Sequence, residues 1–147
     1  MKLKLERVTL NVRDLETAKE FFSQLLNTTF EDFPENTTSL EIIPKPDNFI
    51  KFRAAISPMG IELFESFPKV EHEGIRNVTW RVDDMQEAQE EMKKRGIQHV
   101  YDIKWGRLKE AIYSADDMYG VRWVLNEFPG DSAIKAAREK EQAIHRR

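Results

Sequence analysis

Two similar stretches of the chain carry polar side chains that can bind or polarise a small molecule. The polar residues alternate with apolar ones. They are Arg7, Thr9 and Asn11 in the first stretch and Asn77, Thr79 and Arg81 in the second. Glu62 stands in a later apolar stretch. A guanidinium binds a carboxylate or phosphate through paired hydrogen bonds, and a buried glutamate can act as a general base. These residues predict a site for an anionic or carbonyl-bearing molecule.

The elements that position these residues form a repeat. The sequence VTLNVRDLETAKE at 8–20 returns as VTWRVDDMQEAQE at 78–90. Each copy starts with apolar residues at a period of two, which indicates a half-buried strand. Asp14 or Asp84 then precedes a helical pattern, and aspartate is a preferred N-cap. Further strand-like runs follow each helix, separated by turn signals. Each half therefore predicts one βαβββ unit. In the first unit either TTFEDF or SLEII can supply the strand after the helix.

The predicted fold class is α+β, with two tandem βαβββ units. A four-stranded sheet that is covered by a helix on one face leaves its other face open. Two curved mixed sheets can turn these open faces toward each other and enclose a shared cavity. We assign the units to 1–68 and 69–128, which together make one domain over 1–128. Residues 129–147 predict a charged C-terminal helix or tail that is mostly solvated. Pairing of the units within one chain and exchange between two chains fit the pattern equally.

The composition excludes several classes of protein. The chain has 147 residues, a formal net charge of −3 and no cysteine. It therefore has no disulfide, thiolate metal site or cysteine nucleophile. A basic stripe, the usual mark of nucleic-acid binding, is not expected at this charge. The sequence shows neither a membrane-spanning run nor a signal-peptide core, so we expect a cytoplasmic protein without nucleic-acid or membrane partners.

The motifs resemble those of the vicinal oxygen chelate superfamily. The resemblance rests on the opening VTLNVRDLETAKEFF, its second copy, GIELFE, and the turn and final strand DMYGVRWVL. It extends to about Phe128. The superfamily includes glyoxalase I, methylmalonyl-CoA epimerase, extradiol dioxygenases and the fosfomycin and bleomycin resistance proteins. The resemblance implies the two-unit fold and a homodimer. It does not specify the reaction, because one scaffold supports many chemistries.

The resemblance also implies where a metal would bind. Enzymes of the superfamily usually hold a divalent metal with four side chains, on the first and last strands of each unit. These positions fall on Arg7, Glu62, Asn77 and Val124. Arginine repels a cation and valine has no donor atom, so we predict no metal or other cofactor. The alternative is a divalent metal on a displaced set of ligands, Glu62, His72 and Glu127.

We predict that the cavity is polar and that it binds a small organic molecule without a metal. Lyase- or isomerase-type acid–base chemistry by Glu62 and Arg7 is compatible with this prediction, and so is binding alone. The candidate ligand-binding residues are Arg7, Thr9, Asn11, Phe64, Asn77, Thr79, Arg81, Trp105, Tyr113, Arg122 and Asn126. A buried ion pair of Arg7 and Glu62 without a ligand explains both charges equally well. The rival functions are a metal-dependent enzyme of the lactoylglutathione lyase or ring-cleavage dioxygenase type and a protein-interaction module.

Overall fold

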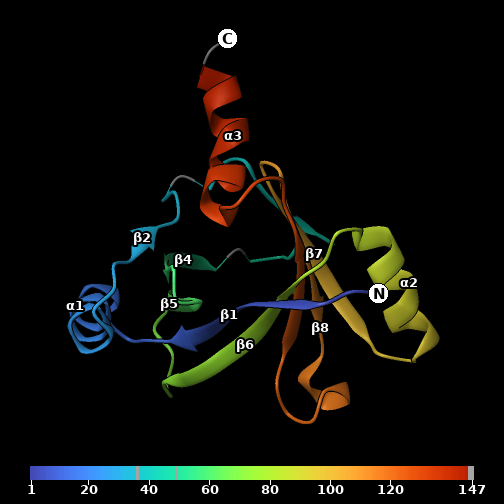
Figure 1. Cartoon of the computed structure of the whole chain (residues 1–147), viewed down its shortest axis with the longest axis horizontal. Coiled ribbons are helices and arrows are strands. Elements are labelled where there is room, and N and C mark those ends of the chain that lie inside the picture. Colours follow the sequence, from blue (N-terminus) through green and yellow to red (C-terminus); the bar gives the residue numbers. More distant parts are fainter. Residues whose placement is uncertain (36, 49, 146–147) are drawn as a thin grey trace.

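The computed structural model describes residues 1–35, 37–48 and 50–145, and within them it has nine strands and three α-helices (Figure 1). The first half contains β1 (Lys4–Asn11), α1 (Leu15–Leu26), β2 (Glu31–Asp32), β3 (Leu40–Ile43), β4 (Lys51–Ser57) and β5 (Ile61–Phe67). The second half contains β6 (Gly74–Arg81), α2 (Met85–Lys94), β7 (His99–Trp105), β8 (Leu108–Tyr113), a short 3₁₀ helix (Ala115–Asp117) and β9 (Trp123–Glu127). Helix α3 (Ala133–His145) follows. None of the described helices is long and apolar enough to span a membrane.

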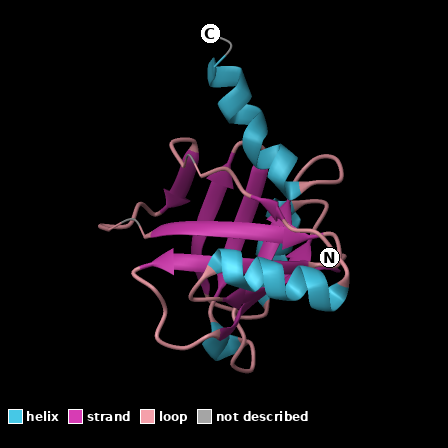
Figure 2. Ribbon diagram, turned by 90° about the vertical axis from the view of Figure 1, so that its left-hand side faces the viewer, coloured by secondary structure: helices cyan, strands magenta, loops and turns pink. Residues whose placement is uncertain are grey.

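The strands form one curled sheet in the order β2-β4-β5-β1-β6-β9-β8-β7-β3 (Figure 2). The two first strands, β1 and β6, pair antiparallel at its centre. Each is also parallel to the last strand of its own unit, so that β1 pairs with β5 and β6 with β9. This mixed sheet with helices confirms the predicted α+β fold of two related units. The two units pair within a single chain.

Helices α1 and α2 lie far apart and cover the outer face of the two halves (Figure 1). Both predicted N-caps are present. The Asp14 carboxylate accepts a hydrogen bond from the Thr17 amide at 2.9 Å, and Asp84 accepts one from Glu87 at 3.1 Å. The inward positions of the repeat, such as Leu15 and Ala88, are buried. The opposite face of the central strands is thereby left to form the inner side of the curl.

Strand β3 takes a place that the sequence does not specify. Both candidate segments are strands, but they lie at opposite edges of the sheet. β2 pairs with β4 of its own unit, whereas β3 pairs with β7 of the other unit, with Leu40 opposite Trp105. The chain therefore passes from one edge of the sheet to the other between Asp32 and Leu40 and returns before β4.

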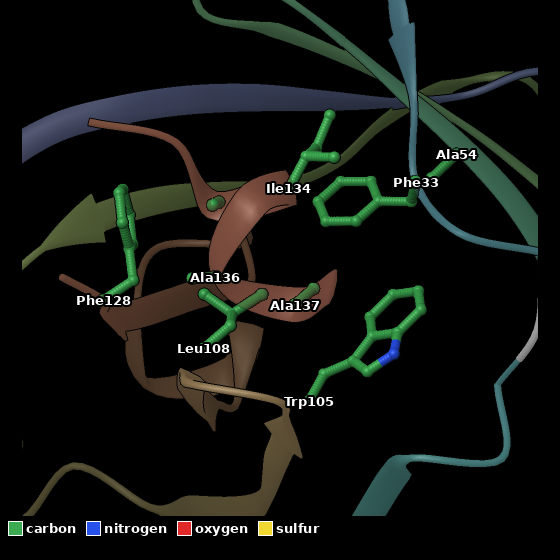
Figure 3. Close-up of a cluster of buried hydrophobic side chains, with 9 residues drawn as sticks. Phe33, Ala54, Trp105, Leu108, Phe128, Ile134, Ala136 and Ala137 are labelled. Atoms are coloured by element: carbon green, nitrogen blue, oxygen red, sulfur yellow. The ribbon is translucent and has the colours of Figure 1, made fainter. Parts of the chain in front are cut away.

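The first turns of helix α3 are packed, which corrects the prediction of a mostly solvated segment for this part of the helix. Its residues Ala133, Ile134, Ala136 and Ala137 are buried. They contact an apolar cluster that includes Phe33, Trp105, Leu108 and Phe128 (Figure 3). The Arg107 amide also donates to the Ala136 carbonyl at 2.8 Å. The apolar first turns explain this packing, because alanine and isoleucine are among the residue types that are most often buried. Helix α3 thus supports one end of the curled sheet.

Candidate functional site

A cavity of about 690 Å³ lies on the inner face of the sheet. Its volume is in the range of small-molecule sites. Polar side chains of the central strands form one part of its surface, which we call the polar strip: Arg7, Thr9, Glu62, Asn77, Thr79 and Glu110. The remaining surface is largely apolar and comes from outer strands and the segment around β3, with residues such as Leu40, Ile42 and Phe52. The sequence predicts a polar cavity. The structure corrects this prediction, because the cavity combines a polar strip with apolar walls.

Arg7 is the centre of the polar strip. Its Nε donates to Glu62 Oε1 at 3.0 Å and its Nη2 donates to Glu110 Oε2 at 2.9 Å. With the Asn126 amide oriented to satisfy both of its ends, Asn126 Oδ1 accepts a bond from Arg7 Nη1 at 3.0 Å. Thr9 Oγ1 donates to Glu62 Oε1 at 2.5 Å. Arg7 is 4% exposed, so this guanidinium is a buried cation that joins two carboxylates.

The charges of this group shift the pKa values of its members. Burial favours the neutral form of Arg7, but the attraction of Glu62 and Glu110 outweighs it and raises the pKa of Arg7. Burial raises the pKa of Glu110, and repulsion by Glu62 adds to this, while Arg7 opposes it only in part. Arg7 is thus held in its charged form, whereas the Glu110 carboxyl retains its proton to a higher pH than an ordinary glutamate does.

The raised pKa of Glu110 predicts a pH effect on stability. The folded state binds the Glu110 proton more tightly than the unfolded state, in which this carboxyl has its ordinary pKa of 4.5. The stabilisation by this group is complete below 4.5 and is lost as the pH rises through the folded-state pKa. We expect the unfolding free energy of wild type, relative to Glu110→Gln, to fall across that window. Urea unfolding of both proteins between pH 4 and pH 8 measures it, and a difference that rises with pH would contradict the assignment.

The structure brings together most of the residues that the sequence selected. Those that line the cavity are Arg7, Thr9, Glu62, Phe64, Asn77, Thr79, Trp105 and Arg122. Asn126 lies behind the polar strip and contacts Arg7. Asn11 is at the end of β1, where its Oδ1 accepts a bond from Arg76 at 3.4 Å, and it does not line the cavity.

Arg81 and Tyr113 lie away from the cavity. Arg81 donates to the carbonyls of Phe128 at 2.8 Å and Gly130 at 2.7 Å, and its guanidinium lies over the Phe128 ring. It holds the chain that leads to α3. Tyr113 is buried in the core beneath α2, and this burial raises its pKa to about 12. The alternation in β8 explains its place, because Leu108, Glu110 and Ile112 face the cavity and Tyr113 has the opposite parity.

Several residues that line the cavity were not predicted from the sequence, and Glu110 and Arg76 matter most for the site. The alternation in LKEAIY could have indicated Glu110, since its parity differs from that of Tyr113. Arg76 had no such signal. In the pairing of β1 with β6, Thr9 is opposite Asn77 but Leu10 is opposite Ile75. This irregularity leaves Arg76 without a partner position, and both Arg76 and its neighbour Asn77 reach the cavity. A bulge can redirect a side chain in this way, and it breaks the period of two.

The residues present do not fit a divalent metal. The guanidinium of Arg7 lies at one of the four implied positions and already binds Glu62. Val124 lines the cavity without a donor atom. The displaced set is not assembled either, because His72 is exposed in the turn before β6 and the Glu127 carboxylate accepts a bond from the Met85 amide at 3.2 Å. Within the described part of the chain, no group of three His, Cys, Asp or Glu side chains can hold a metal.

Comparisons with known proteins agree with the fold. Methylmalonyl-CoA epimerase from Mycobacterium tuberculosis is 19% identical, with a TM-score of 0.66, over 86% of this chain and 88% of that one. A hypothetical protein from Bacillus halodurans is 18% identical, with a TM-score of 0.70, over 90% and 99%. Methylmalonyl-CoA epimerase from Streptomyces coelicolor in complex with 2-nitronate-propionyl-CoA is 13% identical, with a TM-score of 0.67, over 88% and 100%. No curated protein sequence is significantly similar.

The solved structures are below 25% identity and support the fold alone. The sequence provides the stronger link, because a family model matches residues 7–124, which is most of the chain. The chain therefore belongs to the glyoxalase/bleomycin resistance protein/dioxygenase superfamily, the vicinal oxygen chelate group that its motifs resemble.

Proposed function

We propose that this chain binds a small carbonyl-bearing organic acid in the cavity and exchanges a proton at the carbon next to the carbonyl, without a divalent metal. The observation that carries the proposal is the buried Arg7 guanidinium between Glu62 and Glu110. It supplies a fixed positive charge where relatives would place a metal. An arginine has five N–H donors, and Glu62, Glu110 and Asn126 use three of them. Two donors remain to stabilise a developing oxyanion.

The proposed step balances without any other reactant. The Glu110 carboxylate accepts the proton of the carbon–hydrogen bond, and the electron pair of that bond moves into an enolate whose oxygen faces Arg7. After the Glu110 carboxyl exchanges its proton with solvent, it returns a proton to the same carbon, which restores the acid with its hydrogen exchanged and returns Glu110 to the carboxylate. Glu110 suits the first transfer because its raised pKa brings it nearer to neutral pH. Glu62, which was the base predicted from sequence, already accepts bonds from both Arg7 and Thr9.

Hydrogen–deuterium exchange tests this proposal. Methylmalonyl-CoA and a panel of other thioesters and 2-substituted acids are incubated with the protein in D₂O with EDTA, and mass spectrometry follows deuterium uptake. We expect uptake to continue in EDTA and to fall by about 10²- to 10⁴-fold in Glu110→Gln. The matched control is Glu127→Gln, because that carboxylate contacts the start of α2 and does not line the cavity. Uptake that requires added metal, or an unchanged rate in Glu110→Gln, would refute the proposal.

Binding without chemistry is the second candidate, and the extensive apolar walls favour it. A ligand that binds with micromolar affinity but takes up no deuterium would support this candidate over proton transfer.

The homodimer, the cytoplasmic location and the absence of a nucleic-acid partner stay predictions from the sequence. Analytical ultracentrifugation measures the first of these.

A further inference from the structure

Two arginines line the cavity apart from Arg7, and among the described residues neither has an acidic partner. They are Arg76, on β6, and Arg122, just before β9. Neither forms an ion pair with any carboxylate in the described part of the chain, whereas Arg7 has two. Arg76 has a long hydrogen bond to Asn11, at 3.4 Å. The two side chains are partly buried, so their charges are only partly screened by water.

The two arginines also affect each other. Burial lowers the pKa of Arg76, and the charge of Arg122 lowers it further, while Tyr101 and Glu62 oppose this only in part. The position of Arg122 follows from the sheet, because its carbonyl accepts a bond from the Val78 amide at 3.0 Å, which fixes it beside β6. Two like charges held together without a counterion destabilise a fold. An anion between them would remove this repulsion.

An apolar surface leads to this pair of arginines. The Arg76 guanidinium lies over the Phe64 ring at 4.1 Å, and Phe64 stacks on Phe52 at 5.1 Å. Phe52 meets Trp105 edge-on at 5.9 Å, and Trp105 stacks on Phe33 at 5.4 Å. We call Phe33, Trp105, Phe52 and Phe64 the aromatic row, and all four line the cavity. Figure 3 shows its far end, where Phe33 and Trp105 lie beside α3.

We propose that Arg76 and Arg122 bind the acid group of the ligand and that its apolar body lies along the aromatic row. The ligand class is therefore an organic carboxylate with a flat or extended apolar body. This inference rests on the proposed function, because it takes the cavity as a ligand site, and it adds which end of the molecule binds where. Arginine forms paired hydrogen bonds with a carboxylate, and aromatic rings stack on flat apolar groups. The polar strip then faces the middle of the ligand.

Matched ligands can test the two parts of the site separately. Naphthylacetate has both the acid group and the flat body, naphthylacetamide has the body alone, and acetate has the charge alone. Octanoate and 4-phenylbutyrate supply other bodies. Titration calorimetry should show binding of at least one of the larger acids, and at least about tenfold weaker binding of naphthylacetamide than of naphthylacetate. Quenching of Trp105 fluorescence, absent in Trp105→Phe, should accompany binding, since Trp80 and Trp123 pack under α2.

The decisive variants are Arg76→Gln and Arg122→Gln. Each should weaken binding of the acid by at least about tenfold and leave binding of the amide unchanged. Arg13→Gln is the control, because Arg13 is exposed and does not line the cavity, and it removes the same net charge. The melting temperature of Arg76→Gln and Arg122→Gln should stay the same or rise, because the repulsion is removed. A purely structural role would lower it.

The inference fails if none of the larger acids binds below 1 mM, if acid and amide bind equally, or if Arg76→Gln and Arg122→Gln leave the affinity for the acid unchanged. Its failure is distinct from failure of the proposed function. Deuterium uptake that depends on Glu110 but not on Arg76 or Arg122 would overturn the anion site and keep proton transfer. Acid binding that depends on both arginines, without uptake in any ligand, would keep the anion site and remove proton transfer.

Discussion

Replacement of Arg7 by methionine should lower the free energy of unfolding by about 3–5 kcal/mol at neutral pH. Removal of one partner from a buried ion pair leaves an uncompensated charge, and such changes are among the most destabilising single substitutions. Here two carboxylates, Glu62 and Glu110, would lose the same cation. Methionine keeps much of the side-chain volume, so the loss reports charge rather than a cavity. Urea unfolding at pH 7 measures it.

The chain offers a matched control on its surface. Arg53 also joins two glutamates, with its Nη2 at 2.7 Å from Glu16 and its Nε at 3.3 Å from Glu35, but its side chain is 32% exposed. Surface ion pairs contribute about 0–1 kcal/mol, so Arg53→Met should change stability by less than about 1 kcal/mol. Equal losses in Arg7→Met and Arg53→Met would show that the Arg7 group is not desolvated as its burial implies.

A rescue separates the charge effect from packing. The combination of Arg7→Met with Glu62→Gln and Glu110→Gln removes all three charges, and it should recover much of the lost stability. Replacement of a buried charged group by neutral side chains of similar volume is often neutral or better. If the triple variant is more stable than wild type, the charged group is kept for function at a cost to the fold. That result would favour the ligand site over an ion pair that has only a structural role.

The sequence predicts the parts of this fold that have local signals. The repeat, the period of two in β1 and β6, and the Asp14 and Asp84 caps all concern residues close together in the chain. The place of β3 is different, because it depends on pairing with β7. Pairing between strands that are distant in the chain gives no local sequence signal in either strand. The burial of the first turns of α3 was missed because the charged residues that follow dominate the composition of the segment, whereas the small residues of the first turns decide the packing.

The candidate site divides in the same way. Arg7, Thr9, Glu62, Asn77 and Thr79 line the cavity because their strands keep the regular alternation where the sequence suggested it. The alternation also held the information on Glu110, which was overlooked in favour of Tyr113.

Arg76 could not be found from alternation, because an irregular pairing in β6 redirects it. Arg76 and the proposed base Glu110 thus came from the structure, whereas Arg7, Glu62 and Arg122 were predicted from the sequence.

The close contact between Gly106 and helix α3 predicts the second large effect, that of Gly106→Ala. Gly106 lies in the turn between β7 and β8 with a φ of +58°. A Cβ added there would come 2.4 Å from the Ala136 carbonyl oxygen and 2.5 Å from that of Ala137. Both are helix backbone atoms and cannot rotate away, so the turn and α3 must separate.

We expect Gly106→Ala to lower the free energy of unfolding by about 3 kcal/mol, from backbone strain and overpacking together. Gly96→Ala is the matched control, since Gly96 has a φ of +73° and no atom within 4 Å of an added Cβ. It has the strain alone and should lose about 1 kcal/mol. Urea unfolding gives both values, and hydrogen exchange should show faster opening of α3 only in Gly106→Ala.

Because Trp105 precedes this turn and packs on α3, the same variant should also weaken binding along the aromatic row. Equal losses in the two variants would mean that α3 is not held at this distance, and the end of the cavity beside Phe33 and Trp105 would then be open.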